Sequence, residues 1–201
     1  MAGDGDHGAG MCRGADAALE AARGGLVQRA SVGRLLSAAG EMWSERAGGT
    51  SGALWGTGLS AMAASLANRE AYTADNLVAA VAAARDAIIV LGGASPGDKT
   101  MVDALVPLVD TLAEAVNRRM TVPRAVRAAA EAATGAARAT APPRPRKGRA
   151  RPLADKSVGR PDPGAVSLAL IATAVAEHLL PGAPVQAEGL AGQEAGATEE
   201  R

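Results

Sequence analysis

The chain of 201 residues is poor in the residues that many cores and binding surfaces use. It has no phenylalanine, one tyrosine, two tryptophans, two histidines and one cysteine. With so few aromatic rings to stack on bases, no binding to nucleic acid is expected. The 21 basic and 21 acidic residues cancel, so no overall charge draws the chain to a polyanion or an anionic membrane. The chain must therefore recognise any partner through a local site rather than through its overall charge.

The single cysteine, Cys12, excludes an intramolecular disulfide and fits a reducing compartment. We expect it to be a buried filler rather than a nucleophile, because only His7 lies near it in sequence. No signal peptide opens the sequence, and no apolar run approaches the roughly 18 residues of a membrane span. These absences predict a cytoplasmic protein that does not bind membranes.

What the sequence does contain is alanine-rich segments with apolar residues at three- and four-residue spacing. This pattern predicts an all-α protein with one core of Ala, Leu and Val. The expected helices span 9–23, 31–46, 51–69, 74–92, 98–119, 122–139 and 162–180. Their spacing predicts that the following residues are core: Leu59, Met62, Leu66, Leu105, Leu108, Val109, Leu112 and Val116. A domain over 1–181 and a disordered tail over 182–201 follow.

Capping residues refine these expectations. Ser31 and Thr73 are expected N-caps, and Pro123 suits a first helical turn. The pairs Gly24-Gly25 and Gly92-Gly93 are expected to end helices. Pro107 falls inside the fifth helix, where a bend is expected. The Pro- and Arg-rich segment 140–152 reads as a long loop.

The most chemically loaded stretch is "GDGDHG" at 3–8, with Asp4, Asp6 and His7 flanked by glycine. Two carboxylates in a glycine-rich turn suit a hard cation, although an exposed acidic turn near the terminus is an equal alternative. The other histidine, His178, lies in an apolar stretch near a helix end and is expected to be structural.

Three further glycine-rich stretches, "GGTSGALWG" (48–56), "GGASPGDKTM" (92–101) and "GRPDPGAVS" (159–167), also precede or open expected helices. Helix N-termini attract anions, and glycine permits close approach, so together the four stretches resemble a phosphate cradle. Singly, each is also ordinary capping chemistry. None is a Walker A loop, because Gly-Asp-Lys-Thr stands where Gly-Lys-Thr is required and no strand precedes it.

Taken in order, "GDGDHG", "GGTSGALWG", "GASPGDKTMVDALVP", "GRA" and "DPGAVSLAL" resemble the nucleotide-binding L subunit, or L domain, of dihydroxyacetone kinases. The resemblance covers nearly the whole chain, from Gly3 to about Leu180. It implies an antiparallel barrel of eight helices, its N-terminal part missing here, that holds ADP or ATP through two Mg²⁺ ions.

The resemblance also implies a role for individual residues. The implied metal ligands are Asp4 and Asp6. The implied nucleotide-binding residues are His7, Gly8, Ala9, Gly10, Thr50, Ser51, Gly92, Met101, Arg149, Asp162, Pro163 and Gly164. No catalytic residue beyond this Mg–nucleotide site is assigned to the chain.

The implied activity is phosphoryl transfer to dihydroxyacetone, or a similar small ketose, bound covalently to a histidine of a separate K subunit or domain, so this chain is not expected to be active alone. Two routes remain open. ATP is the donor in one; in the other, bound ADP is rephosphorylated in place by a protein of the sugar phosphotransferase system.

One departure from the family pattern concerns the start. The family has a further Mg-binding aspartate one to two helical turns before "GDGDHG", on a helix that follows another, whereas here Met1 comes first. A start assigned too far downstream is the favoured explanation, and a real truncation is the alternative. The truncation motivates a rival function, a non-catalytic regulator or scaffold that has kept the fold with weakened nucleotide binding.

Overall fold

The computed structural model describes residues 6–69, 71–147 and 157–179, and in these residues it contains only helices and turns. The helices are α1 (His7–Val27), α2 (Val32–Ala47), α3 (Gly49–Leu66), α4 (Ala74–Gly92), α5 (Val102–Asn117), α6 (Val122–Ala139) and α8 (Pro163–His178). The all-α prediction is confirmed. Each of the seven expected helices overlaps one of these, and the segments 1–5 and 180–201 of the predicted domain and tail lie outside the described residues.

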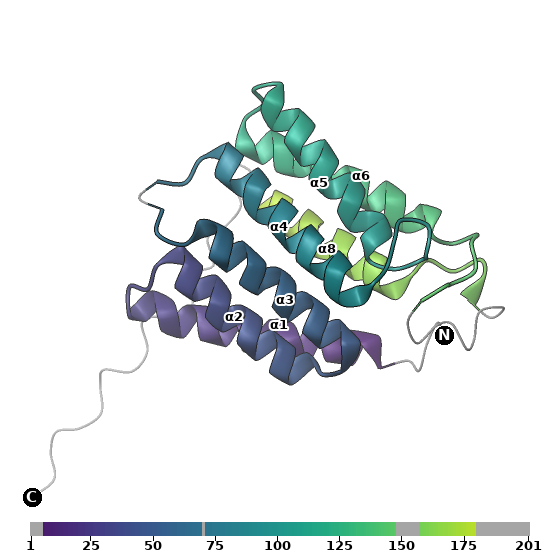
Figure 1. Cartoon of the computed structure of the whole chain (residues 1–201), viewed down its shortest axis with the longest axis horizontal. Coiled ribbons are helices and arrows are strands. Elements are labelled where there is room, and N and C mark those ends of the chain that lie inside the picture. Colours follow the sequence, from purple (N-terminus) through teal and green to yellow (C-terminus); the bar gives the residue numbers. More distant parts are fainter. Residues whose placement is uncertain (1–5, 70, 148–156, 180–201) are drawn as a thin grey trace, which may run out of the picture.

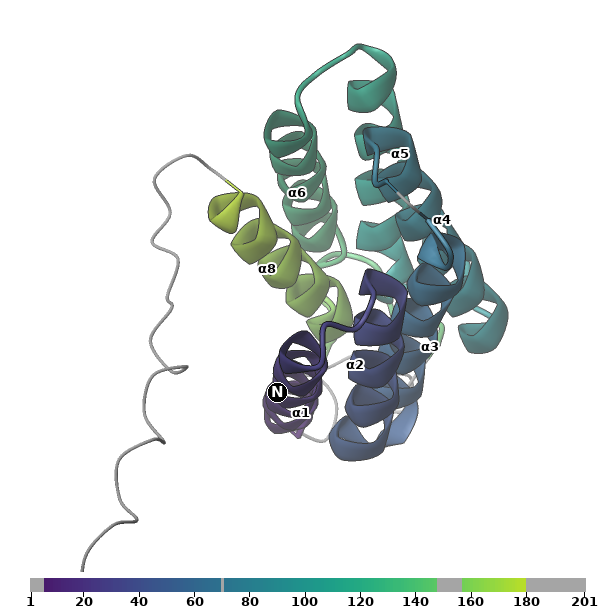
Figure 2. The same ribbon diagram turned by 90° about the vertical axis from the view of Figure 1, so that its left-hand side faces the viewer.

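The helices run roughly antiparallel along the chain. Helices α1, α2 and α3 pack side by side, α3 packs against α4, and α4 leads into a second group in which α8 packs against α6 and α5 (Figures 1 and 2). Because direction alternates, α1, α3, α5 and α8 all begin at the same end, on the right in Figure 1. We call this the junction end, since the described parts of the four glycine-rich stretches lie there.

The larger of two apolar clusters is built around α5. Residues Leu105, Val109 and Leu112 of that helix are 2–3% exposed, and they pack with alanines of α6 and α8. Of the eight predicted core residues, the five on α5 and Leu66 are buried, while Leu59 and Met62 are half-buried. The predicted Ala, Leu and Val core is therefore confirmed.

Glycine lets α2 and α3 approach closely. A Cβ added at Gly56 would lie 2.7 Å from the carbonyl oxygen of Gly40, and one added at Gly40 would lie 2.9 Å from that of Gly56. Next to this contact, the rings of Trp43 and Trp55 stack with centroids 5.2 Å apart. The two helices thus meet backbone to backbone, with the two tryptophans packed beside them.

Most of the expected caps are present. The side chains of Ser31 and Thr73 accept hydrogen bonds from the backbone N–H groups of Arg34 and Asn76, the second within a full capping box. Gly93 ends α4 in the left-handed region, and proline stands in the first turn of α6. Pro107 lies inside α5, where the bend stays a prediction.

Three expectations were wrong. Helix α1 does not stop at Gly24-Gly25 but continues to Val27; a Cβ at Gly25 would lie 2.5 Å from Cδ2 of Leu35, so close packing on α2 explains that glycine. Helix α5 begins at Val102 rather than 98, because the preceding residues form a hydrogen-bonded turn. Cys12 is exposed rather than buried.

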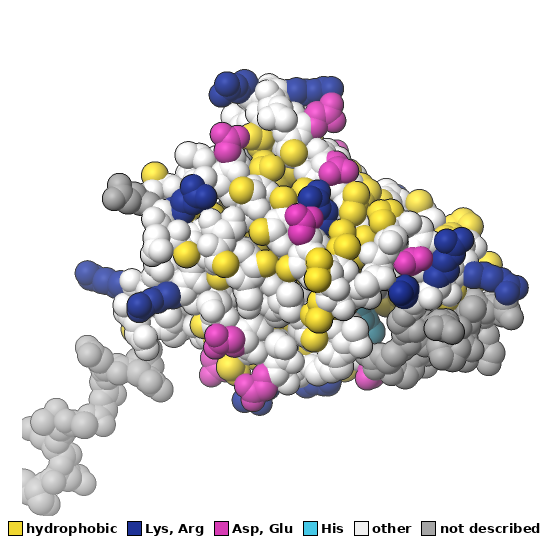
Figure 3. All heavy atoms as spheres, viewed as in Figure 1, with side chains coloured by type: hydrophobic (Ala, Val, Ile, Leu, Met, Phe, Trp, Pro, Cys, Tyr) yellow, Lys and Arg dark blue, Asp and Glu magenta, His cyan; other side chains and the backbone are white. Residues whose placement is uncertain are grey.

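The surface carries no obvious single-sign field on the face seen in Figure 3, where basic and acidic side chains are intermixed with apolar ones. This agrees with the balanced composition of the chain. Among the described residues, none of the helices is long and apolar enough to cross a bilayer.

The close contact between α2 and α3 predicts opposite effects of the same substitution at two glycines. Gly56→Ala places a methyl group 2.6 Å from Cβ of Ser44, so the free energy of unfolding should fall by about 1–3 kcal/mol. Gly135→Ala, on α6, meets no atom within 4 Å and should stabilise by about 0.5–1 kcal/mol. Chemical denaturation of both variants measures the difference, and equal effects would contradict the close packing.

Candidate functional site

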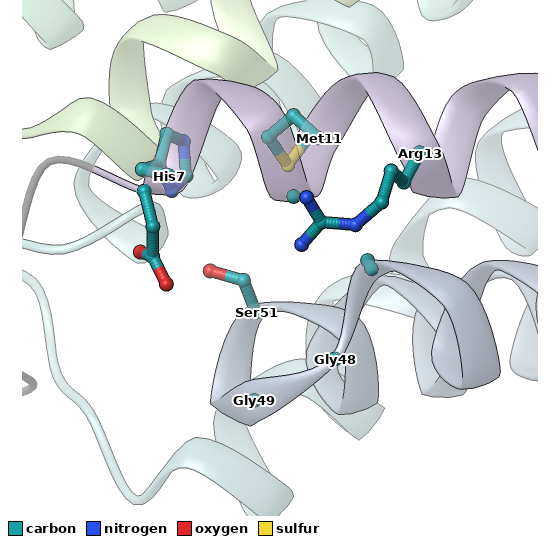
Figure 4. Close-up of a pocket in the computed structure, with 9 residues that line it drawn as sticks. His7, Met11, Arg13, Gly48, Gly49 and Ser51 are labelled. Carbon is teal, nitrogen blue, oxygen red and sulfur yellow. The ribbon is translucent and has the colours of Figure 1, made fainter.

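The first part of the candidate site lies between the starts of α1 and α3. Here a pocket of about 190 Å³ is lined by Asp6, His7, Gly10, Met11 and Arg13 from the α1 side and by Ala47, Gly48, Gly49 and Ser51 around the start of α3. Figure 4 shows Ser51 and the side chains of His7 and Arg13 around this space. Two sequence stretches about 40 residues apart are thus brought to one pocket.

Both helix starts turn amide groups toward the same region. The first intrahelical bond of α1 runs from Gly10 N–H to the Asp6 carbonyl, and that of α3 from Gly52 N–H to the Gly48 carbonyl. The amides of residues 7–9 and 49–51 therefore precede the helical ladders, and such groups together with the helix dipole attract anions. Asp6 is the N-cap of α1, yet its side chain does not cap the helix.

Arg13 adds a positive charge to this pocket and was not among the predicted site residues. Its Nε donates to the carbonyl of Arg46 in the last turn of α2, at 3.3 Å, and this bond helps orient the guanidinium. In Figure 4 the guanidinium lies between α1 and the start of α3. Arg13 comes three residues after Gly10, so the two residues share a face of α1, and this spacing was the available sequence signal.

A long-range hydrogen bond ties the start of α1 to α8. The Nε2 atom of His7 lies 2.8 Å from Oγ of Ser167, a partner 160 positions away in the sequence. Ser167 comes one turn after the "DPG" stretch that opens α8. The first and last of the glycine-rich stretches therefore meet through their side chains, which no local sequence pattern predicts.

The second part of the site lies where the turn before α5 meets the start of α8. Gly164 packs on Met101, since a Cβ added to the glycine would lie 3.3 Å from Met101 Cβ. Asp162 is the N-cap of α8, and its Oδ2 accepts from the N–H of Ala165 at 2.8 Å. The backbone N–H of Asp162 donates to Oγ1 of Thr140 at 2.7 Å, which fixes the approach to the helix.

Asp103 shapes the "SPGDKT" turn beside this contact. Its two carboxylate oxygens accept from the N–H groups of Gly97 at 2.6 Å and Thr100 at 2.7 Å. Gly97 has φ +94 and Lys99 φ +61, so the chain reverses sharply before α5 begins. This turn replaces the first helical turn that the sequence pattern predicted over 98–101.

The charge state of Asp162 is perturbed by its surroundings. Burial raises the pKa of Asp162 to about 6, and the N–H groups of Ala165 and Gly164 offset part of that rise. The nearby Asp103 carboxylate raises the pKa further, while the Lys99 ammonium lowers it. The carboxyl is thus poised close to neutral pH.

The structure brings most of the predicted residues to the junction end. His7, Gly10 and Ser51 line the pocket, with Gly8, Ala9 and Thr50 exposed in the same first turns of α1 and α3. Met101, Asp162, Pro163 and Gly164 form the second part, and Gly92 ends α4 against Leu54. Asp4 and Arg149 lie outside the described residues.

A metal site made by side chains alone is not seen in the described part of the chain. There, no group of three or more His, Cys, Asp or Glu side chains is arranged to hold an ion. The pocket does offer oxygen donors in Asp6 and Ser51. Such a set suits Mg²⁺, which commonly takes one or two carboxylates and completes its shell with water and phosphate oxygens.

The sequence matches the DAK2 domain family over residues 1–177. It is 52% identical over 177 residues to D-erythrulose kinase of Mycolicibacterium smegmatis. This match covers 88% of this chain and 30% of that protein. It is 36% identical over 166 residues to the ADP-binding subunit DhaL of the PEP-dependent dihydroxyacetone kinase of Escherichia coli, covering 83% of this chain and 78% of that subunit.

Among solved structures, the dihydroxyacetone kinase of C. freundii is similar, with a TM-score of 0.55 and 25% identity. The match covers 80% of this chain and 27% of that one. The chain therefore spans about 30% of the length of the erythrulose kinase and most of the length of the DhaL subunit.

Replacing Asp162 by asparagine should change how stability depends on pH between about pH 4 and 6. The folded carboxyl ionises at about 6 and the unfolded one near 3.8, so in this interval the folded state binds more protons. The contribution of Asp162 to the free energy of unfolding therefore falls as pH rises, by on the order of 3 kcal/mol in total. Asp162→Asn keeps an oxygen for the Ala165 N–H and removes this fall.

Denaturation of both proteins across this pH range measures the effect. The stability of the wild type relative to the variant should decline from pH 4 to 6 and then level off. Parallel stability curves would show that Asp162 ionises normally in the fold.

Proposed function

This chain belongs to the DAK2 domain family, and on that basis we propose that it is the nucleotide-binding part of a kinase for a small ketose. The observation that carries the proposal is the convergence of the α1 and α3 N-termini on one pocket that also holds Asp6, Ser51 and Arg13. Such a pocket combines amide donors, a cation and a carboxylate, which are the groups that a Mg–nucleotide requires.

In the proposed complex, the phosphates lie across the starts of α1 and α3. The amides of residues 7–9 and the N–H and hydroxyl groups of Thr50 and Ser51 donate to phosphate oxygens. These donors are held by regular helices, so they need little reorganisation as charge shifts during phosphoryl transfer. His7, held by Ser167, keeps the start of α1 next to α8.

Magnesium is proposed to be held by Asp6 together with Asp4. When bound, Mg²⁺ supplies positive charge to the phosphate oxygens. The placement of Asp6 at the N-cap of α1, with its carboxylate lining the pocket, supports this role. Two ions are proposed by resemblance to the family, with nucleotide phosphates providing the ligands that the chain does not.

The adenosine end of the nucleotide is proposed to lie toward the second part of the site. Gly92 and Met101 would contact it, Asp162, Pro163 and Gly164 would form its edge, and Arg149 would reach it from the α6–α8 connection. The contact between Met101 and Gly164 supports this assignment, because it makes residues from two distant stretches one surface. The bond between His7 and Ser167 joins α8 to the start of α1, which supports placing this surface next to the proposed phosphate pocket.

The phosphoryl acceptor is proposed to be dihydroxyacetone or a related ketose held by a K subunit or domain. The names of the relatives include kinases of a three-carbon and of a four-carbon ketose, so both are candidate substrates. Two phosphoryl donors, ATP and a protein of the phosphotransferase system, fit the same site. Retention of ADP through gentle purification would favour rephosphorylation in place by a phosphotransferase-system protein, whereas rapid exchange with labelled ATP would favour ATP itself.

The proposal is tested by titrating the 201-residue chain with ADP and Mg²⁺ in a calorimeter. Wild type should bind, and Asp6→Asn should show no measurable binding at millimolar nucleotide, because a carboxylate that faces metal and phosphate is neutralised. His178→Ala, at the exposed C-terminal turn of α8, is the matched control and should bind as wild type.

Two outcomes would count against this function. Equal binding by the two variants would refute the assignment of Asp6. Absence of binding by the wild type would refute the nucleotide site in this chain and favour the regulator or scaffold.

A further inference from the structure

A buried lysine that the proposed chemistry does not use lies beneath the start of α8. Lys99, in the turn between α4 and α5, is 3% exposed. Its Nζ donates to the backbone carbonyls of Ala141 at 3.1 Å, Pro143 at 3.0 Å and Ser157 at 2.7 Å. An ammonium group has three N–H donors, so these three acceptors satisfy it completely.

The three acceptors come from the two ends of the connection between α6 and α8. Ala141 and Pro143 follow α6 directly, whereas Ser157, which is fully buried, lies six residues before α8. The Lys99 side chain therefore holds the two ends of the connection together, the end that follows α6 and the end that precedes α8, and joins both to the α4–α5 turn. The connection enters the turn a second time through Arg146 N–H, which donates to the Asp98 carbonyl at 3.0 Å.

Two backbone bonds carry this arrangement toward the site. Gly159 N–H donates to the Ala141 carbonyl, which also accepts from Lys99. Asp162 N–H donates to Thr140 Oγ1, one residue before that carbonyl. The segment from Ser157 to Asp162 thus returns along residues 140–141, and the ammonium lies at the point where the two segments converge.

The burial of this ammonium costs free energy of folding. Removing an ammonium from water costs several kcal/mol even when its hydrogen bonds are made, and burial lowers the pKa of Lys99 accordingly. The residue is further held at φ +61, a conformation that side-chain-bearing residues rarely adopt. A glycine would avoid both costs but would not draw three carbonyls to one point.

We propose that Lys99 is a positioning residue, whose ammonium fixes the α6–α8 connection so that Asp162 and Gly164 stay in place against Met101 before nucleotide arrives. The inference rests on the proposed nucleotide site and adds to it a residue that does not touch the ligand. Without the ammonium, Asp162 and Gly164 occupy their binding-competent position only part of the time. The apparent Kd for the nucleotide then rises by the inverse of that fraction.

The test compares Lys99→Met and Lys99→Gln with Lys147→Met, an exposed lysine in the same connection. Calorimetry at a temperature well below unfolding should give a Kd for Mg–ADP raised about tenfold or more in both Lys99 variants and unchanged in Lys147→Met. Amide exchange of the ligand-free protein should quicken at Gly159 and Asp162 in the Lys99 variants and stay unchanged in α2 and α3. The glutamine variant keeps two N–H donors and guards against misfolding of the methionine variant.

Chemical rescue separates the ammonium from general packing. Lys99→Cys is made in a Cys12→Ser background, so that one thiol remains in the chain. It is alkylated while unfolded with 2-bromoethylamine, which restores an ammonium, or with 1-bromopropane, which gives a neutral chain of similar length. After refolding, the aminoethylated protein should bind Mg–ADP nearly as wild type, and the propylated protein should remain weak.

The outcomes distinguish this inference from the function on which it rests. If wild type binds and the Lys99 variants bind equally well, the positioning role is refuted while the nucleotide site stands. Equal binding by the two alkylated proteins refutes it as well, because packing alone would then suffice. If wild type itself does not bind Mg–ADP, the proposed function fails and the positioning role fails with it.

Discussion

The arrangement depends on how closely the helix backbones approach one another. With no phenylalanine, the core relies on alanine and glycine, and Ala80, Ala104, Ala125, Ala133 and Ala165 are entirely buried. Small side chains leave little room for sliding, so the relative positions of the helix ends are set by backbone contact. An anion site built from helix N-termini needs this, because amides act together only when their directions are fixed.

The fold was largely predictable because its signals are local. Apolar spacing located all seven described helices, and caps such as Ser31 and Thr73 were read correctly because they bond within four residues. The glycines were harder. Gly93 ends a helix, whereas Gly25 sits inside one against Leu35, and the difference comes from a neighbouring helix that sequence order does not reveal.

The candidate site was predictable in its residue types but not in its construction. The glycine-rich stretches indicated phosphate-binding loops, and the antiparallel order of the helices explains why they gather at one end. What joins them was not foreseen. The His7–Ser167 bond spans nearly the whole chain, and the sequence around Lys99 gives no sign of the three distant carbonyl groups that accept from its ammonium.

Because of the antiparallel order, the described polypeptide begins and ends at opposite ends of the domain. The described chain begins at Asp6, beside the pocket between α1 and α3, and α8 carries it away for 16 residues, roughly 24 Å, to Leu179 at the far end. In a longer polypeptide, a module joined ahead of α1 would begin next to the pocket that is proposed to hold the phosphates. A module joined after α8 must fold back along the whole domain, so its linker length would decide whether it can reach the same place.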